Sequence, residues 1–433
     1  MIKQEMIRQE LIRQELRSGR FRWFTVMACA ILFVSAAFAQ TEKVLYSFTG
    51  GTDGSQPDAG LTPDGAGNYY GSTFFGGEYG WGVIYKLSHA SSGWTETVLY
   101  NFQGGSEDGA SPAGTLILDS AGNIYGITVA GGKGYGIQEE PGYGIAFELS
   151  PSGSGWTETI IHFFDNTDGG PSSGFIRDAA GNLYGETGGG NASGNNGTVY
   201  LMRSTPDGWE YGILYRFQGG NDGDYPYGGL IFDAKGNLYG TTIEGGGTAG
   251  DGTVFELERG TSGGWTEKQL YAFQNTADGV APQAPVVFDK AGNLYGTTVW
   301  GGDACSPYGC GLVFELSPSG DTWTKSTLYT FTGEPNGHAP SAGLSFDKAG
   351  DIFGTTSNGG SNDSGALFEL KPQPGGGWQE SIVESFTDGS NGGYPSTPLI
   401  VSGTNIYGTA GSGGQYGHGI VFEMSNAASE QSE

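Results

Sequence analysis

Short segments in which apolar and polar residues alternate recur along the chain, separated by clusters of Gly, Asn, Asp and Pro. One stretch carries four of them, at residues 228–233 (GGLIFD), 237–242 (NLYGTT), 252–257 (GTVFEL) and 265–273 (WTEKQLYAF). Alternation with a period of two predicts half-buried strands, and the clusters between them predict tight turns. No segment of the stretch has helical spacing. We therefore expect a unit of four short antiparallel strands.

This unit is repeated seven times, which determines the expected architecture. Each copy contains a phrase of the type Gly-Asn-Leu-Tyr-Gly, and the closing glycines are 54 to 59 residues apart. They are Gly71, Gly126, Gly185, Gly240, Gly296, Gly354 and Gly408. A four-stranded sheet repeated at such a period is typical of propeller blades, which bury their faces against their neighbours. The sequence predicts an all-β, seven-bladed propeller of four-stranded antiparallel blades.

The ends of the repeat array predict how the ring closes. The fourth-strand phrase also stands before the first blade, at residues 42–48 (EKVLYSF), whereas the last copy ends at residues 421–424 (VFEM) and continues into a polar tail at 425–433. We expect the N-terminal strand to complete the last blade, which would remove a free sheet edge. The propeller would span residues 40–424, and we expect a monomer.

The first 39 residues have the pattern of an export signal. Six basic residues precede an apolar run at residues 24–38, which ends in Ala37-Phe38-Ala39. A run of this length is short for a membrane span, which needs about 20 residues, so cleavage near Ala39 is expected and an uncleaved anchor is the alternative. We expect a periplasmic or extracellular protein without a membrane span in its mature chain.

The charge narrows the choice of partners. The chain carries a formal net charge of −27, and removal of the signal, with its 6 basic and 3 acidic residues, makes it −30. Nucleic acid is excluded as a partner, because its binding depends on Lys and Arg that neutralise phosphates. A glycan or an extracellular protein remains.

Cys305 and Cys310 are the two cysteines of the expected mature chain, and they lie in the loop between the second and third strands of the fifth blade. Export places them where disulfides persist. We predict a disulfide within this loop, and a free thiol pair is the alternative.

A recurring turn, Phe-x-x-x-x-Asp/Asn-Gly-x-x-Pro, connects successive blades. Its acidic position is Asp53, Asp108, Asp168, Asp222 and Asp278, and asparagine replaces the acid at Asn336 and Asn391. A ring of carboxylates suggests Ca²⁺ ligands. The alternative is a structural turn, in which Gly adopts positive φ and Asp or Asn bonds to its own backbone.

The loops between second and third strands vary most among the copies and would share one face with these turns. Variation between regular repeats is where binding specificity usually resides. Several loops contain aromatic residues that form our candidate ligand-binding face: Phe74, Phe75, Tyr79, Trp81, Tyr135, Tyr143, Trp300, Tyr308 and Tyr416. Aromatic rings beside Asp, Asn and Glu are suited to a carbohydrate. The alternative is that the rings seal the blades.

Catalytic motifs are weak. None of the four histidines recurs at an equivalent position, and no nucleophile elbow or phosphate loop is present. The inner strands offer small or apolar groups to the channel, such as residues 59–60 and 113–114. Glu186 replaces the Thr of most copies and could serve a two-carboxylate hydrolase together with a loop acid. We assign no catalytic residue.

The phrases Gly-Asn-Leu-Tyr-Gly-Thr-Thr, Gly-Thr-Val-Phe-Glu-Leu and Leu-Tyr-x-Phe, in tandem over residues 42–424, resemble the GloVer-type tandem repeat family of exported bacterial proteins. The resemblance implies export and no established activity. We expect a secreted, non-enzymatic propeller that binds a glycan or an envelope protein. The alternatives are an exported enzyme acting on carbohydrates or lactones, and a purely structural envelope component.

Overall fold

A computed structural model describes the protein over residues 40–133, 142–189, 194, 196–261, 263–274, 276–305 and 307–426. All of these residues belong to one compact unit, Gln40–Glu433. The predicted export signal at residues 1–39 and the candidate Tyr135 lie outside the described residues.

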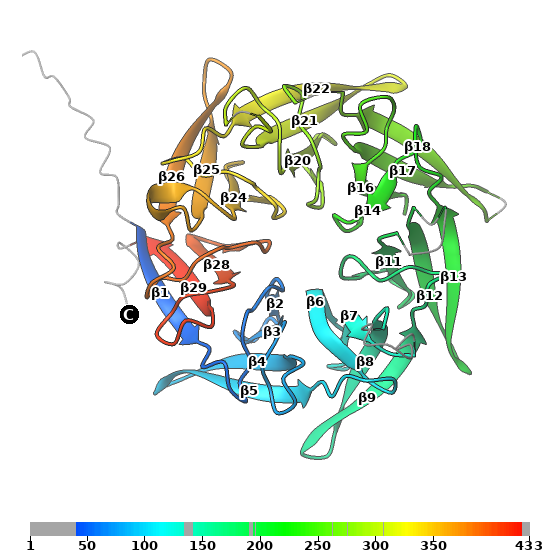
Figure 1. The fold of residues 1–433 in the computed structure, drawn as a ribbon, viewed down its shortest axis with the longest axis vertical. Helices are drawn as coiled ribbons and strands as arrows, with labels where there is room; N and C mark the ends of the chain where they lie inside the picture. Colours follow the sequence, from blue (N-terminus) through cyan, green and yellow to red (C-terminus); the bar gives the residue numbers. More distant parts are fainter. Residues whose placement is uncertain are drawn as a thin grey trace, which may run out of the picture. The chain divides into compact units, whose positions relative to one another are not determined.

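Seven antiparallel sheets are arranged radially around a central space, which confirms the predicted propeller (Figure 1). In six of the sheets the strands follow chain order from the centre outward, and in the seventh β1 stands outside β29; we number the sheets as blades 1 to 7. Across the described ranges, one short 3-10 helix occurs, η1 (Gly360–Asn362), and no helix has the length and hydrophobicity required to cross a membrane.

The strands of the blades have the following bounds. Blades 1 and 2 contain β2 (Thr62–Pro63), β3 (Tyr69–Thr73), β4 (Val83–Ala90) and β5 (Gly93–Asn101), then β6 (Gly109–Leu118), β7 (Ile124–Gly131), β8 (Ile145–Ser152) and β9 (Gly155–Phe163). Blades 3 and 4 contain β10 (Ile176–Arg177), β11 (Leu183–Thr187), β12 (Thr198–Thr205) and β13 (Gly208–Arg216), then β14 (Asp224–Pro226), β15 (Ile231–Phe232), β16 (Leu238–Glu244), β17 (Thr253–Arg259) and β18 (Trp265–Ala272). Blades 5 and 6 contain β19 (Val287–Phe288), β20 (Leu294–Thr298), β21 (Leu312–Ser319) and β22 (Thr322–Thr330), then β23 (Ser345–Phe346), β24 (Ile352–Thr356), β25 (Ala366–Pro372) and β26 (Trp378–Ser385). Blade 7 contains β27 (Ile400–Ser402), β28 (Asn405–Ala410), β29 (Ile420–Asn426) and β1 (Gln40–Ser47).

The two ends of the described chain meet in blade 7. β1 pairs antiparallel with β29, from Gln40 opposite Asn426 to Ser47 opposite Ile420. Figure 1 shows β1, in blue, beside β29, in red. This pairing confirms the predicted closure. β29 runs two residues beyond Met424, so the propeller extends to Asn426 rather than ending at residue 424.

The innermost strands are shorter than the sequence predicts. The expected first strand at residues 228–233 reduces to the two residues of β15, preceded by the separate strand β14. Gly229 lies at φ +92, outside the conformation of a regular strand. In two other blades Pro285 and Pro398 stand at this point and have no N–H for a ladder. The chain therefore leaves the sheet where it approaches the channel.

Within every blade, an aromatic ring of the third strand lies over the glycine that closes the repeated phrase. A Cβ added at Gly240, Gly296, Gly354 or Gly408 would stand 2.6 Å from the ring tip of Phe255, Phe314, Phe368 or Phe422, respectively. A side chain there would force the ring to shift. The repeated glycine is therefore required by close approach of a ring, one of the recognised uses of Gly in a strand.

The same rings join neighbouring blades. The phenylalanine that follows the fourth strand of each blade, which ends a Leu-Tyr-x-Phe phrase in five of the seven copies, is fully buried and packs on the third-strand ring of the next blade, with centroids 5.0 to 5.4 Å apart. The seven pairs are Phe48–Tyr85, Phe102–Phe147, Phe164–Tyr200, Phe217–Phe255, Phe273–Phe314, Phe331–Phe368 and Phe386–Phe422. One aromatic contact thus crosses every blade boundary, including the one closed by β1.

We predict that Gly296→Ala lowers the free energy of unfolding by about 1–3 kcal/mol, because the new methyl group overpacks against Phe314. Urea denaturation measures the change. Gly212→Ala is the matched control, because Gly212 lies in β13 and a Cβ added there would have nothing within 4 Å. Equal effects of the two substitutions would refute the close-approach argument.

Candidate functional site

Each predicted Ca²⁺ ligand lies in its own turn between two blades, where protein donors already contact it. Asp53 accepts hydrogen bonds from the Tyr46 hydroxyl (3.0 Å) and the Thr49 N–H (2.8 Å). Asp222 repeats the arrangement with the Tyr215 hydroxyl (2.7 Å) and the Gln218 N–H (2.6 Å). The side chain thus links the turn to the end of the preceding strand.

The other three aspartates follow the same design. Asp108 accepts from the Tyr100 hydroxyl, Asp168 contacts His162 Nε2 at 2.9 Å, and Asp278 accepts from the Tyr271 hydroxyl. These five residues stand at five separate blade boundaries. In the described part of the chain, no group of three or more His, Cys, Asp or Glu side chains could hold a metal ion. The five aspartates are therefore not brought together around a common point, and calcium binding stays a prediction.

A second set of acidic residues, which the sequence analysis missed, faces these aspartates from the next blade. Glu158 Oε2 accepts a hydrogen bond from Tyr100 (2.9 Å), which also bonds Asp108. Burial raises the pKa of Glu158 to about 8, and the charge of Asp108 adds to it. Burial and the charge of Asp53 likewise raise the pKa of Glu96 to about 8.

These acids occupy one position of the repeat, two residues after the tryptophan that opens the fourth strand. Glu267 has this position in blade 4, where burial and then the charge of Asp222 raise its pKa to about 7. In blade 5 the position is Lys325, whose Nζ lies 3.0 Å from Asp278 Oδ1. The recurrence of Trp-x-Glu in the sequence was the signal that could have revealed them.

Most candidate aromatic residues lie at the surface. Phe75, Tyr79, Trp81, Trp300, Tyr308 and Tyr416 are exposed, with Tyr308 the most exposed at 69%. Phe74 is half-buried and packs edge-to-face on Phe75. Tyr143 is half-buried, and its hydroxyl donates to Asn166 Oδ1 at 3.0 Å.

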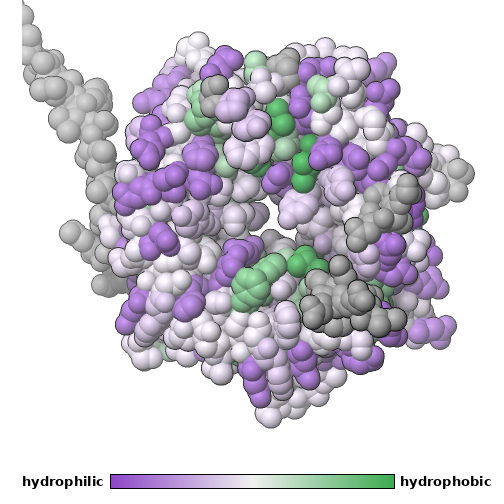
Figure 2. All heavy atoms as spheres, in the orientation of Figure 1, coloured by the Kyte–Doolittle hydropathy of each residue, from purple (hydrophilic) through white to green (hydrophobic). Residues whose placement is uncertain are grey.

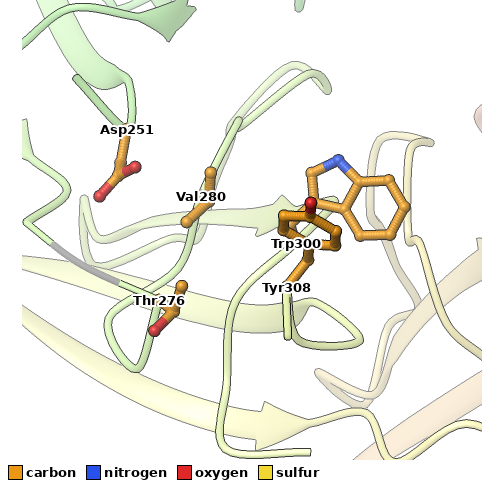
Figure 3. Close-up of a pocket in the computed structure, with 5 residues that line it drawn as sticks. All are labelled: Asp251, Thr276, Val280, Trp300 and Tyr308. Carbon is orange, nitrogen blue, oxygen red and sulfur yellow. The ribbon is translucent and has the colours of Figure 1, made fainter. Parts of the chain in front are cut away.

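Trp300 and Tyr308 are brought together in a pocket, which we call the Trp300 pocket. It has a volume of about 380 Å³ and is lined by these two residues with Asp251, Thr276 and Val280. The two ring centroids are 6.5 Å apart. Figure 3 shows both rings on one side of Val280, with Asp251 and Thr276 on the other. Burial, followed by the charge of Asp278, raises the pKa of Asp251.

The loop that carries Tyr308 is fixed at both ends. A disulfide joins Cys305 to Cys310, with the two Cα atoms 5.3 Å apart, which confirms the predicted bridge. The Gly301 N–H donates to the Tyr308 carbonyl (2.8 Å), and the Gly309 N–H donates to the Cys305 carbonyl (3.0 Å). The main chain at Tyr308 is thereby held to Gly301, and the disulfide and the second hydrogen bond hold the rest of the loop to itself.

Glu186 lies inside the ring wall, fully buried. Its Oε2 accepts hydrogen bonds from the Gly229 N–H (2.8 Å) and the Ser173 hydroxyl (3.3 Å). It thus ties blade 3 to blade 4, and burial raises its pKa to about 7. These hydrogen bonds indicate a structural role for Glu186 between the two blades. A catalytic role for Glu186 stays a prediction.

The chain matches one family of repeat proteins in sequence. The model of the Gloeobacter/Verrucomicrobia repeat family matches residues 28–200, 135–304 and 305–432. No curated protein matches in sequence.

Among solved structures, the chain is similar to a candidate 6-phosphogluconolactonase from Bacteroides uniformis. The identity is 13%, 77% of this chain and 85% of that chain are covered, and the TM-score is 0.48. It is also similar to a candidate oxidoreductase of the glucose dehydrogenase type from Thermus thermophilus, at 16% identity, 74% and 97% coverage and a TM-score of 0.44. At these values neither similarity bears on activity.

We predict that the protein is more stable at pH 5.5 than at pH 8.5. Glutamates such as Glu96 and Glu158 titrate near 4.5 when unfolded and near 8 when folded, so the folded state binds their protons more tightly. The stability they contribute is full below pH 4.5 and is lost as the pH rises toward 8. Thermal unfolding at constant ionic strength measures the difference.

The double variant Glu96→Gln, Glu158→Gln should flatten this pH dependence. Glu210→Gln is the control, because the Glu210 side chain is exposed on β13. A midpoint that rises between pH 5.5 and pH 8.5 would contradict the assignment.

We predict that reduction of Cys305–Cys310 lowers the free energy of unfolding by about 2 kcal/mol, the value expected for closing so short a loop. Denaturation with and without a thiol reductant measures this. The double variant Cys305→Ser, Cys310→Ser should show no response to reductant. A response in that variant would mean that the effect arises elsewhere.

Proposed function

The chain belongs to the Gloeobacter/Verrucomicrobia repeat family, and we propose that it is an exported, non-enzymatic propeller that binds a glycan at the Trp300 pocket. The observation that carries the proposal is the pairing of two exposed rings, Trp300 and Tyr308, beside the polar groups of Asp251 and Thr276. Rings of this kind pack on the C–H faces of a sugar, and neighbouring oxygens bond its hydroxyls.

The pocket has the size and composition of a small-ligand site. Its volume of about 380 Å³ lies within the range of 300–1,000 Å³ typical of such sites. Asp251 is a strong hydrogen-bond acceptor when ionised, and the Thr276 hydroxyl can donate or accept. The lining is predominantly apolar, which suits the C–H face of a sugar, and these two side chains are the polar groups of the lining that its hydroxyls could reach.

Charge favours a neutral or cationic glycan over an acidic one. The chain has a net charge of −27, and the pocket lining contains one carboxylate and no cationic side chain. An anionic glycan would be repelled on approach and would find no counter-charge in the pocket.

The loop geometry supports binding by a preformed surface. The disulfide and the hydrogen bond between Gly301 and Tyr308 restrict the backbone beside the ring before any ligand arrives. Restricting a binding loop in advance reduces the entropy lost on association. A disulfide also suits an oxidising compartment, in agreement with the export expected from residues 1–39.

We predict that Trp300→Ala and Tyr308→Ala each weaken binding of a neutral glycan at least about tenfold, because aromatic anchors of a binding site contribute on the order of 2 kcal/mol. A glycan array identifies the ligand, and calorimetry with that ligand measures the affinities. Ile213→Ala is the control, since Ile213 is exposed on β13, away from the pocket. Undiminished binding in both aromatic variants would exclude the pocket, and an array without any bound glycan would refute the function.

A further inference from the structure

We infer that the mouth of the central channel is a second binding site, for a neutral mono- or disaccharide. A cavity of about 610 Å³ lies between the innermost segments of the blades. Figure 2 shows the corresponding hollow at the centre of the ring, with hydrophobic surface along its lower rim and hydrophilic or neutral surface on its other sides. None of its lining residues belongs to the Trp300 pocket, so the two sites are separate.

Six of the residues that line this cavity hold the same position in the repeat, directly after the recurring proline. We call them the polar ring: Asp58, Ser172, Tyr227, Gln283, Ser341 and Ser396. In blade 2, Pro112 is followed at once by Ala113, so that blade contributes no such side chain. The residue type changes from blade to blade, yet each one can form hydrogen bonds. The residues that follow, such as Ala59 and Ala284, are small and buried.

The backbone fixes where these side chains stand. The residue before the proline has a positive φ, for example +57 at Ala281, +57 at Ala339 and +55 at Tyr394. This conformation is unusual for residues other than Gly and costs about 1–3 kcal/mol where it occurs. A hydrogen bond to the preceding blade holds each of the three, from the Ala281 N–H to the Asp251 carbonyl, from Ala339 to Cys310 and from Tyr394 to Ser364.

Several members of the polar ring are available to a ligand. The side chains of Gln283, Ser341 and Ser396 are half-buried and make no hydrogen bond to the described part of the chain. Ser172 donates to the Pro226 carbonyl at 2.7 Å, and Asp58 accepts from Gln56 Nε2 at 2.7 Å. Three unpartnered polar side chains around one hollow are a set of donors and acceptors that a polyhydroxylated molecule can satisfy together.

Aromatic surface and charge define the ligand class further. Phe74 and Tyr227 line the same cavity, and aromatic rings can pack on the C–H groups of a sugar ring. The lining contains Asp58 as its acid and no Lys, Arg or His, so an acidic sugar has no counter-charge there. The volume of about 610 Å³ suits one or two sugar units.

The test uses the mature chain and a panel of neutral mono- and disaccharides, with glucuronate as the acidic comparison. Binding is measured by calorimetry and by saturation-transfer NMR. At least one neutral sugar should bind, and the double variant Gln283→Leu, Ser341→Ala should weaken it at least tenfold. Trp300→Ala should leave this binding unchanged, which separates the channel site from the Trp300 pocket.

Thermal unfolding verifies that the double variant folds, and Ser396→Phe, which fills the channel from another blade, provides a second way to block the site. The inference is overturned if no neutral sugar binds, if glucuronate binds better than every neutral sugar, or if only Trp300→Ala removes binding. Loss of binding in Ser396→Phe and in the double variant, with binding intact in Trp300→Ala, supports it.

Discussion

This propeller depends on the close approach of an aromatic ring to a glycine of the neighbouring strand in the same blade. In each blade the third-strand ring occupies the space above the closing glycine, and the phenylalanine of the preceding blade packs on that ring. Glycine, ring and incoming phenylalanine form one stack that is shared by two blades. The stack explains why the period of the sequence survives while the loops diverge, because a change at any of its three positions disturbs two blades at once.

Electrostatics at the blade boundaries oppose this apolar packing. Pairs such as Asp108 and Glu158 place two carboxyl groups around one tyrosine hydroxyl, where neither is fully hydrated. Blade 5 resolves the conflict differently, with the nearly buried Lys325 neutralising Asp278. The chain thus tolerates a repeated acidic pair wherever the carboxyl group of Glu can keep its proton, and replaces it by an ion pair in one case.

The fold could be predicted from the sequence because the residues that form the stacks recur in every copy of the repeat. The period, the strand pattern and the extra phrase at residues 42–48 predicted seven blades and their closure. The short inner strands were not foreseen, since positive φ at residues such as Gly229 is a property of the folded turn. The sequence predicted the two aromatic residues of the Trp300 pocket but not Asp251 and Thr276, because backbone turns that no spacing rule predicts bring those two side chains to the pocket. The polar ring was not predicted, because the residue after the recurring proline differs from blade to blade and so forms no sequence motif.

The pairing of β1 with β29 makes the ring a single kinetic unit. A hydrogen-bonded ladder between the two ends encloses roughly 370 residues, and closing a loop of that length costs about 5 kcal/mol of chain entropy. Contacts of such sequence separation are intrinsically slow to form, so we expect blade 7 to receive its fourth strand after the other blades have formed. Until then β29 presents an unpaired edge to any other extended chain. On this reasoning, ring closure is the step most exposed to misassembly.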